Sequence, residues 1–241
     1  DNTFGSFSNQ ACSIIVWNDI IMNSNSFIDC KGIGDNCLPI FEVDLKNSSV
    51  IEFAFDDFKF INNQFNNKED LWLNGGGTGF VLKINQDESK EVTLSFINCV
   101  FTGNMAENKG GALYISDSST VQTLLSFDNC VFDDNKCGSS SMNALYLNVK
   151  KMSFVDCIFG ENSNQADQEA SSIHSLENEM NSLVYIADSP EALSIANCIF
   201  IPSTRITDQE QKMSSMVYVA NCLQRISITE CTFGRNSNQE Q

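Results

Sequence analysis

The sequence predicts an all-β protein, a right-handed parallel β-helix (a solenoid) of about seven coils, formed by residues 1–241 as a single domain. Three observations predict it. A short motif ending in Cys-x-Phe recurs along the chain, a second strand-like motif precedes most copies, and no convincing amphipathic helix lies between them. A repeat of about 30 residues without a helix cannot bury its own apolar face, and stacking copies solves this.

The first motif has five clear copies, at residues 96–101, 127–132, 154–159, 195–200 and 228–233. Two earlier copies, at 27–30 and 60–65, are degraded, and we align Cys30 and Asn63 with the cysteine position there. Successive copies of this position lie 27 to 41 residues apart. A constant motif at a variable interval indicates that each coil has a constant set of strands, which we call a rung, joined by loops of differing length.

The residue before the cysteine explains how the motif turns. Asn98, Asn129 and Asn197 tolerate the left-handed conformation, so each can bend the chain between two strands and let both Phe and Cys point inward. We therefore expect a core ladder in which equivalent residues of successive coils stack. Its members are Cys30, Cys99, Cys130, Cys157, Cys198, Cys231, Phe101, Phe132, Phe159, Phe200 and Phe233.

The second motif is apolar and alternating, as in half-buried strands. Its copies lie at 41–43, 80–82, 113–115, 145–147, 184–186 and 217–219, and we assign 14–16 to the first coil. All four tyrosines of the chain fall at its centre: Tyr114, Tyr146, Tyr185 and Tyr218. Alternation places them opposite their apolar neighbours. They form either a partner-binding face or an outer face covered by the chain's own loops.

Stacked rungs lie about 4.8 Å apart, so seven coils predict a rod of roughly 30–35 Å. Parallel crossovers favour the right hand. The main alternative, an antiparallel sandwich, needs hairpins and gives no reason for distant units to share columns. Residues 163–181 and 203–215 are predicted to be polar insertions, and 236–241 a flexible tail.

Composition argues against several functions. The net charge of −17 repels nucleic acid and anionic lipid. No apolar run reaches the roughly 18 residues of a membrane span. The chain has no C-x-x-C motif, and its one histidine, His174, has no nucleophile-elbow partner. Pairs Asp56-Asp57 and Asp133-Asp134 occupy different rung positions. We expect no catalytic residue, no cofactor and no metal site.

Four cysteines lie outside the repeated position: Cys12, Cys37, Cys137 and Cys222. A disulfide among them stays open, because spacing alone does not pair them.

Each rung closes with Phe-x-x-Asn, at 101–104, 132–135, 159–162 and 233–236, and Gly-Gly-Ala-Leu opens the unit at 110–113. From about Gly75 onward these motifs resemble the polymorphic outer-membrane protein repeats of chlamydial surface proteins, and similar repeats occur in some protist surface proteins. The resemblance implies a β-helical ectodomain, outside the cell or on its surface. An intracellular scaffold is the alternative, because reduced core thiols fit the cytoplasm equally well.

The function expected from the resemblance is that of a non-enzymatic structural or adhesive protein. It would contact a protein partner or sibling copies through its side faces or ends. The alternative is a carbohydrate-binding or carbohydrate-active β-helix, which would need converging carboxylates on one face.

Overall fold

The computed structural model describes residues 2–5, 12–16, 20–23, 25–28, 31–33, 41–46, 52–66, 80–85, 92–106, 110–116, 123–137, 145–160, 163–164, 182–186, 191–201, 215–219 and 225–234. The strands of this part form five sheets, and every pairing within them is parallel. The described part contains no helix. The predicted all-β class is confirmed there, and the parallel sheets are those that a β-helix requires.

The largest sheet has eight short strands. In spatial order they are β1 (Asn2–Gly5), β4 (Asn25–Ile28), β8 (Lys59–Ile61), β12 (Val100–Thr102), β16 (Val131–Asp133), β20 (Ile158–Phe159), β24 (Ile199–Phe200) and β27 (Thr232–Phe233).

The seven-stranded sheet holds the first half of each Cys-x-Phe motif. Its strands are β3 (Ile20–Asn23), β7 (Glu52–Asp56), β11 (Val92–Ile97), β15 (Thr123–Asp128), β19 (Lys151–Val155), β23 (Ala192–Ala196) and β26 (Arg225–Thr229).

The second motif forms two further sheets. The three-stranded sheet contains β2 (Cys12–Val16), β6 (Phe41–Lys46) and β10 (Phe80–Asn85), and the four-stranded sheet contains β14 (Leu113–Ser116), β18 (Leu145–Asn148), β22 (Ser182–Ile186) and β25 (Ser215–Val219). The fifth sheet contains β5 (Lys31–Ile33), β9 (Gln64–Asn66), β13 (Met105–Ala106), β17 (Lys136–Cys137) and β21 (Ser163–Asn164).

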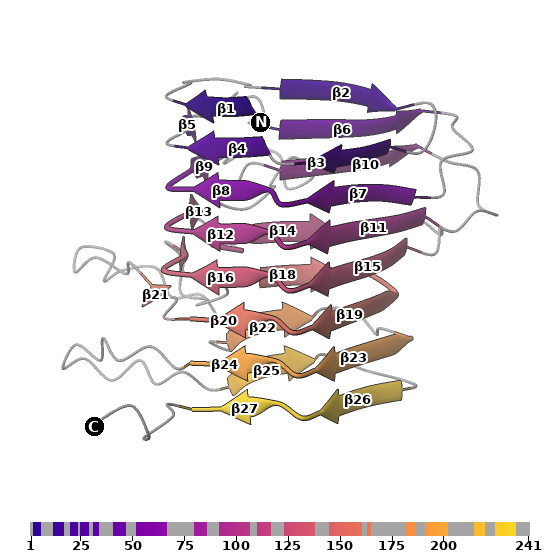
Figure 1. Cartoon of the computed structure of the whole chain (residues 1–241), viewed down its shortest axis with the longest axis vertical. Coiled ribbons are helices and arrows are strands. Elements are labelled where there is room, and N and C mark those ends of the chain that lie inside the picture. The colour runs from indigo at the N-terminus through magenta and orange to yellow at the C-terminus, as the bar shows by residue number, and fades with distance from the viewer. Residues whose placement is uncertain are drawn as a thin grey trace, which may run out of the picture.

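Successive strands of one sheet are separated in sequence by strands of the other sheets, so the chain returns to the same sheet one rung further on. Figure 1 shows this stack, with the N-terminal strands at one end and the yellow C-terminal strands at the other. Strands β7, β11, β15, β19, β23 and β26 lie above one another on the near side, each leading into a strand of the eight-stranded sheet.

Two columns of phenylalanine run through the interior. In the eight-stranded sheet, rings from Phe60 to Phe233 stack on one another, with centroids 4.6 to 5.1 Å apart in successive rungs. The seven-stranded sheet adds a stack from Phe55 to Phe154, at 5.1 Å per step. Rings of the two columns meet edge to face, as Phe96 and Phe101 do at 69°. Side chains alternate between the two faces of each strand, so each rung adds one inward side chain to each of these columns.

The left-handed corners predicted from the Asn-Cys step are confirmed. Asn98, Asn129 and Asn197 have φ values of 53°, 51° and 53°. Equivalent corners at Asp57, Asp156 and Glu230 have φ values of 57°, 53° and 54°. The corner lets Phe96, Cys99 and Phe101 all point inward, and each of the three is fully buried.

The predicted alignment of the two degraded copies is wrong. Phe60 pairs with Phe101, the closing phenylalanine, and Lys59 pairs with Val100. The residue equivalent to Cys99 is therefore Phe58, which is fully buried and packs edge-on against Phe55 at 5.0 Å. Sequence comparison misplaced Asn63 because Phe60 also fits the first position of the motif, which Phe55, five residues earlier, occupies: Phe55 pairs with Phe96.

The first copy shifts in the same way. Phe27 pairs with Phe60, so it is also a closing phenylalanine. Cys30 lies outside the described residues, but its neighbours Ile28 and Lys31 pair with Ile61 and Gln64. The alignment of Cys30 with Cys99 is therefore wrong. Similarly, Cys12–Ile14, not 14–16, pairs with Phe41–Val43.

The predicted polar insertions begin or end inside strands. Ser163 and Asn164 form β21, which pairs with β17, and Ser215 begins β25. Residues 165–181, 203–214 and 236–241 lie outside the described residues, as do His174, Cys37 and Cys222.

Candidate functional site

Five cysteines follow one another along the stack. The carbonyl of Cys99 accepts a hydrogen bond from the N–H of Val131, and Cys130, Cys157 and Cys198 each bond the next rung in the same way. All five thiols, from Cys99 to Cys231, are free. Cys99, Cys130, Cys157 and Cys198 are fully buried, and Cys231 is half-buried. The sulfur atoms therefore form a single internal file.

Backbone carbonyls satisfy these thiols. Each Sγ donates to the carbonyl two residues earlier, at 3.2 to 3.4 Å. Cys99, Cys130, Cys157 and Cys231 also approach a carbonyl of the preceding rung, such as that of Phe96 at 3.3 Å from Cys130.

Three thiols of the file, those of Cys130, Cys157 and Cys198, have a raised pKa and are held in the neutral form. The hydrogen bond with Cys130 and burial raise the pKa of Cys157 to about 12, against an ordinary value of 9.0, although the bond with Cys198 lowers it. The bond with Cys157 and burial also raise the pKa of Cys198 above its ordinary value. The bond with Cys157 lowers the pKa of Cys130, but the bond with Cys99 and burial together outweigh it and raise that pKa overall. Thiols that stay protonated are poor nucleophiles and poor metal ligands.

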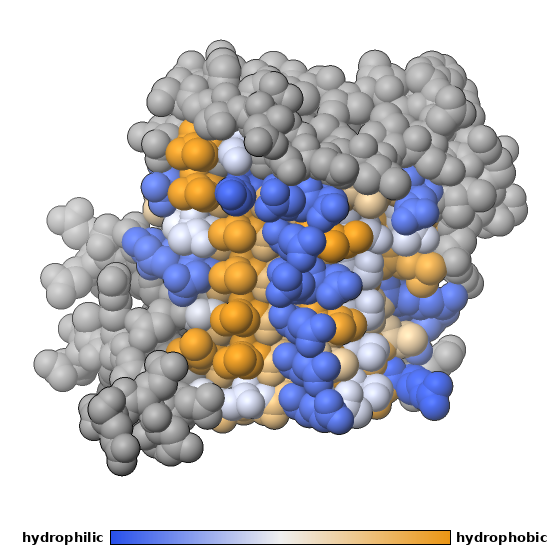
Figure 2. Space-filling model, in the orientation of Figure 1, coloured by the Kyte–Doolittle hydropathy of each residue, from blue (hydrophilic) through white to orange (hydrophobic). Residues whose placement is uncertain are grey.

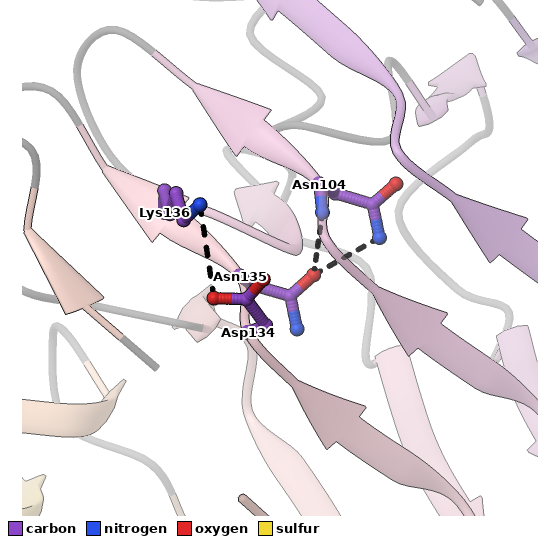
Figure 3. A network of polar contacts seen from close by, with 4 residues as sticks. All are labelled: Asn104, Asp134, Asn135 and Lys136. Carbon is purple, nitrogen blue, oxygen red and sulfur yellow. Dashed lines mark hydrogen bonds and ion pairs between the residues drawn. The ribbon is translucent and has the colours of Figure 1, made fainter. Parts of the chain in front are cut away.

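A second internal ladder consists of asparagines. Asn63, Asn104 and Asn135 are buried. Figure 3 shows the Asn135 carbonyl oxygen accepting from the backbone N–H of Asn104 at 3.1 Å and from its side-chain amide at 3.0 Å. The side-chain oxygen of Asn104 accepts in turn from the backbone N–H of Asn63 at 3.0 Å and from the side-chain amide of Asn63 at 3.1 Å. The amides also donate to the carbonyls of Phe60 and Phe101 at 2.9 and 2.8 Å.

These asparagines are the last residues of the Phe-x-x-Asn motif. A second left-handed corner precedes each one, at Asn62, Gly103 and Asp134, with φ values of 53°, 67° and 48°. Beside the ladder, Lys136 pairs with Asp134 at 3.7 Å, as Figure 3 shows. The motif thus has a structural role: it turns the chain and satisfies the buried backbone of the turn.

The four tyrosines do form one column. Tyr114 pairs with Tyr146, Tyr146 with Tyr185, and Tyr185 with Tyr218. The rings of Tyr114 and Tyr146 stack at 4.8 Å and 9°, and both residues are half-buried, as is Tyr218. The neighbouring Leu113 and Leu145 are fully buried. Because the rings of Tyr114 and Tyr146 stack on one another, each has one flat face covered by the other.

Sequence reasoning missed an apolar stripe on the outer face of the eight-stranded sheet. Val100, Val131, Ile158 and Ile199 follow one another in register. Ile158 is 38% exposed, and the other three are half-buried. We call these four residues the outer stripe. The signal was present in the sequence, since each follows the cysteine of its motif and precedes an inward phenylalanine.

Polar corner residues border the outer stripe. Asn98, Asn129, Asp156 and Asn197 are exposed. Asn129 donates to Asn98 at 2.8 Å, and Asn98 donates to Asp56 at 3.1 Å. Figure 2 shows a hydrophobic column beside a continuous hydrophilic column on this face. The face is therefore a straight apolar row bordered by the polar corner residues.

The structure thus separates the predicted residues into three places. The predicted core residues are buried from Cys99 to Phe200, whereas in the last described rung Cys231 is half-buried and Phe233 is 49% exposed. The tyrosines lie on the four-stranded sheet, and the outer stripe lies on the eight-stranded sheet. Of the cysteines outside the file, Cys12 begins β2 and Cys137 ends β17.

Two further findings concern the described residues only. They contain no group of three or more His, Cys, Asp or Glu side chains arranged to hold a metal ion. None of them forms a helix of the length and apolarity needed to cross a membrane.

Comparison with known proteins identifies no relative. No protein-family model matches the chain, and no curated protein and no solved structure is significantly similar to it.

Proposed function

We propose that this protein is a non-enzymatic structural β-helix that associates side by side with sibling copies through the outer stripe. The observation that carries the proposal is the stripe itself: four β-branched side chains in register, one per rung, on an outer face.

The proposal includes a right-handed helix of about seven coils. The seven-stranded sheet supports the number, because each coil contributes one strand to it. In Figure 1 the near strands run right to left, the far strands left to right, and the chain descends from its N-terminal to its C-terminal strands. This path supports the right hand, which parallel crossovers favour in general.

Periodicity favours a sibling copy as the partner. A row with one side chain every 4.8 Å or so is matched along its whole length only by a row of the same repeat. Two such rows can interdigitate, as the faces of packed sheets do. The stripe is smaller than a standard protein interface, so we expect weak association.

The chemistry of the thiols supports a non-enzymatic role. Cys130 and Cys157 are buried, and a hydrogen bond from one neighbouring thiol together with burial raises the pKa of each, so both stay neutral. Burial also protects them from oxidation, which fits the extracellular location suggested by the resemblance to chlamydial surface repeats.

Sedimentation velocity over a range of protein and salt concentrations tests the proposal. The chain carries a net charge of −17, so copies repel one another. Salt screens this repulsion, and association should therefore strengthen as the NaCl concentration rises from about 0.05 to about 0.5 M. Replacing Val131 and Ile158 together by threonine keeps the charge and the strand propensity but removes apolar surface. We expect the double variant to remain monomeric.

Val155→Thr is the matched control, because Val155 is half-buried on the outer face of the seven-stranded sheet. It should associate like the wild type. A wild-type chain that stays monomeric at every salt and protein concentration would overturn the proposal. Association that the double variant retains would show that another face is used.

A further inference from the structure

The outer face of the seven-stranded sheet carries a groove that the proposed function does not use. Its volume is about 650 Å³, and its lining comes from β11, β15, β19, β23 and β26. The groove therefore crosses five adjacent rungs and runs along the axis of the stack.

Hydroxyl groups line the groove at regular intervals. Ser126, Ser153, Ser194 and Ser227 lie in one column, paired rung to rung, and all four belong to the lining. Ser126 donates to Ser95 of the preceding rung at 3.0 Å. The column thus offers hydrogen-bond donors and acceptors at the spacing of the rungs, about 4.8 Å.

The groove is basic, whereas the chain as a whole is acidic. Lys151 and Arg225 belong to the lining, which includes no Asp or Glu. Both stand in the column beside the serines, with Ala192 between them. Their backbones are therefore two rungs apart, about 10 Å. Arg225 is exposed, and Lys151 is half-buried. Two described acidic residues lie close to this column but outside the lining: Glu191 directly precedes Ala192, and Glu52 pairs with Thr93 at the far end of the groove.

We propose that this groove binds an acidic oligosaccharide with a carboxylate on every second sugar. Lys151 and Arg225 would each hold one carboxylate, and the serine column would exchange hydrogen bonds with the sugar hydroxyls between them. The two cations favour a ligand that carries carboxylates. Because the cations are two rungs apart, they favour a ligand in which neighbouring carboxylates are separated by about the same distance.

An extended acidic peptide fits less well. The groove lies on the face of the sheet, where the backbone groups of β15, β19 and β23 already pair with their neighbours. A peptide gains its main-chain hydrogen bonds by adding to a sheet edge, so on this face its backbone amides would lose water without gaining partners. A sugar chain brings hydroxyls, which match serine. A nucleic acid has a phosphate on every residue and is repelled by the net charge of −17.

Titration calorimetry at low salt with a hyaluronan octasaccharide tests the site, because hyaluronan alternates a uronate with a neutral amino sugar. We expect Lys151→Ala and Arg225→Ala each to weaken binding about tenfold, the loss typical of one charge-assisted contact. The double variant should show no measurable binding. Lys59→Ala is the matched control: Lys59 is exposed on the eight-stranded sheet, outside the groove, and its loss should leave the affinity unchanged.

Three competing probes test the chemistry. A neutral chitin oligosaccharide, an oligogalacturonide with a carboxylate on every sugar, and polyglutamate should all bind more weakly than hyaluronan. The proposal is overturned if hyaluronan does not bind, or if Lys59→Ala weakens binding as much as the groove variants do. Equal binding of the neutral sugar would refute the role of the cations, equal binding of the oligogalacturonide would refute the spacing, and equal binding of polyglutamate would refute a carbohydrate ligand.

Discussion

Two kinds of residue fix the conformation of each rung: corner residues with a positive φ and buried polar residues that bond to the backbone. The buried asparagines show this best, because one carbonyl oxygen of Asn135 accepts two hydrogen bonds from Asn104, and the Asn104 amide also donates to Phe60. Each asparagine satisfies backbone groups that the turn would otherwise leave unpaired inside the protein. The ladder therefore couples neighbouring rungs by polar contacts as well as by stacked rings.

Replacing Asn104 by alanine should lower the free energy of unfolding by about 3 kcal/mol, because it removes two buried hydrogen bonds from Asn63 and one to the carbonyl of Phe60. Chemical denaturation monitored by circular dichroism measures the change. Asn98→Gly is the control: Asn98 is exposed, and glycine accepts its positive φ, so the loss should stay below about 1 kcal/mol. Equal losses in the two variants would contradict a structural role for the buried ladder.

The sequence predicted the residue-scale features where the motif repeats without ambiguity. The left-handed corners at Asn98, Asn129 and Asn197 follow from the tolerance of asparagine for positive φ. It did not predict that Phe58 takes the cysteine position, because phenylalanine fits every inward column of a β-helix equally well. Only pairing between rungs separates such columns, and pairing is a long-range property.

Each strand depends on the corner before it, because the conformation of the corner sets which side chains of the strand point inward. The strand of the seven-stranded sheet ends at Asp128, Asn129 turns the chain, and Cys130 and Phe132 are again buried. A corner that fails would place the wrong side chains inside, because a shift of one residue reverses the faces of a strand.

Asn129→Ala should destabilise the protein by about 1 kcal/mol relative to Asn129→Gly, because alanine is strained at a φ of 51° and glycine is not. Both variants lose the hydrogen bond from Asn129 to Asn98, so their difference isolates the backbone strain. Thermal unfolding of the two variants measures it. An alanine variant as stable as the glycine variant would mean that the corner does not require the left-handed conformation.

At this scale the sequence predicted strands well and surfaces poorly. Alternation identified the tyrosine column and the inward residues around it. The groove was not predicted, because its lining combines several columns from five rungs. The outer stripe was missed although its residues recur at one position of the motif, directly after the cysteine.

At the scale of the whole molecule, the part of the chain that the structure describes is a stack in which each rung packs its apolar side chains on those of the next. Its surface faces differ in character: an apolar stripe lies on the eight-stranded sheet, and a basic groove lies on the seven-stranded sheet. Stacking explains both, because any outward residue that recurs in the motif becomes a row along the axis. The two proposed contacts therefore use different rows of one repeat, and variants in one row should leave the other unaffected.

The central claim is that the rungs stack in parallel and in register. Anomalous diffraction from the sulfur atoms of a crystal tests it most directly. We predict that the Sγ atoms of Cys99, Cys130, Cys157, Cys198 and Cys231 appear as one row, with successive atoms about 4.8 Å apart. Sulfur positions scattered through the molecule, or neighbours in the row that are not neighbours in the series, would contradict the account.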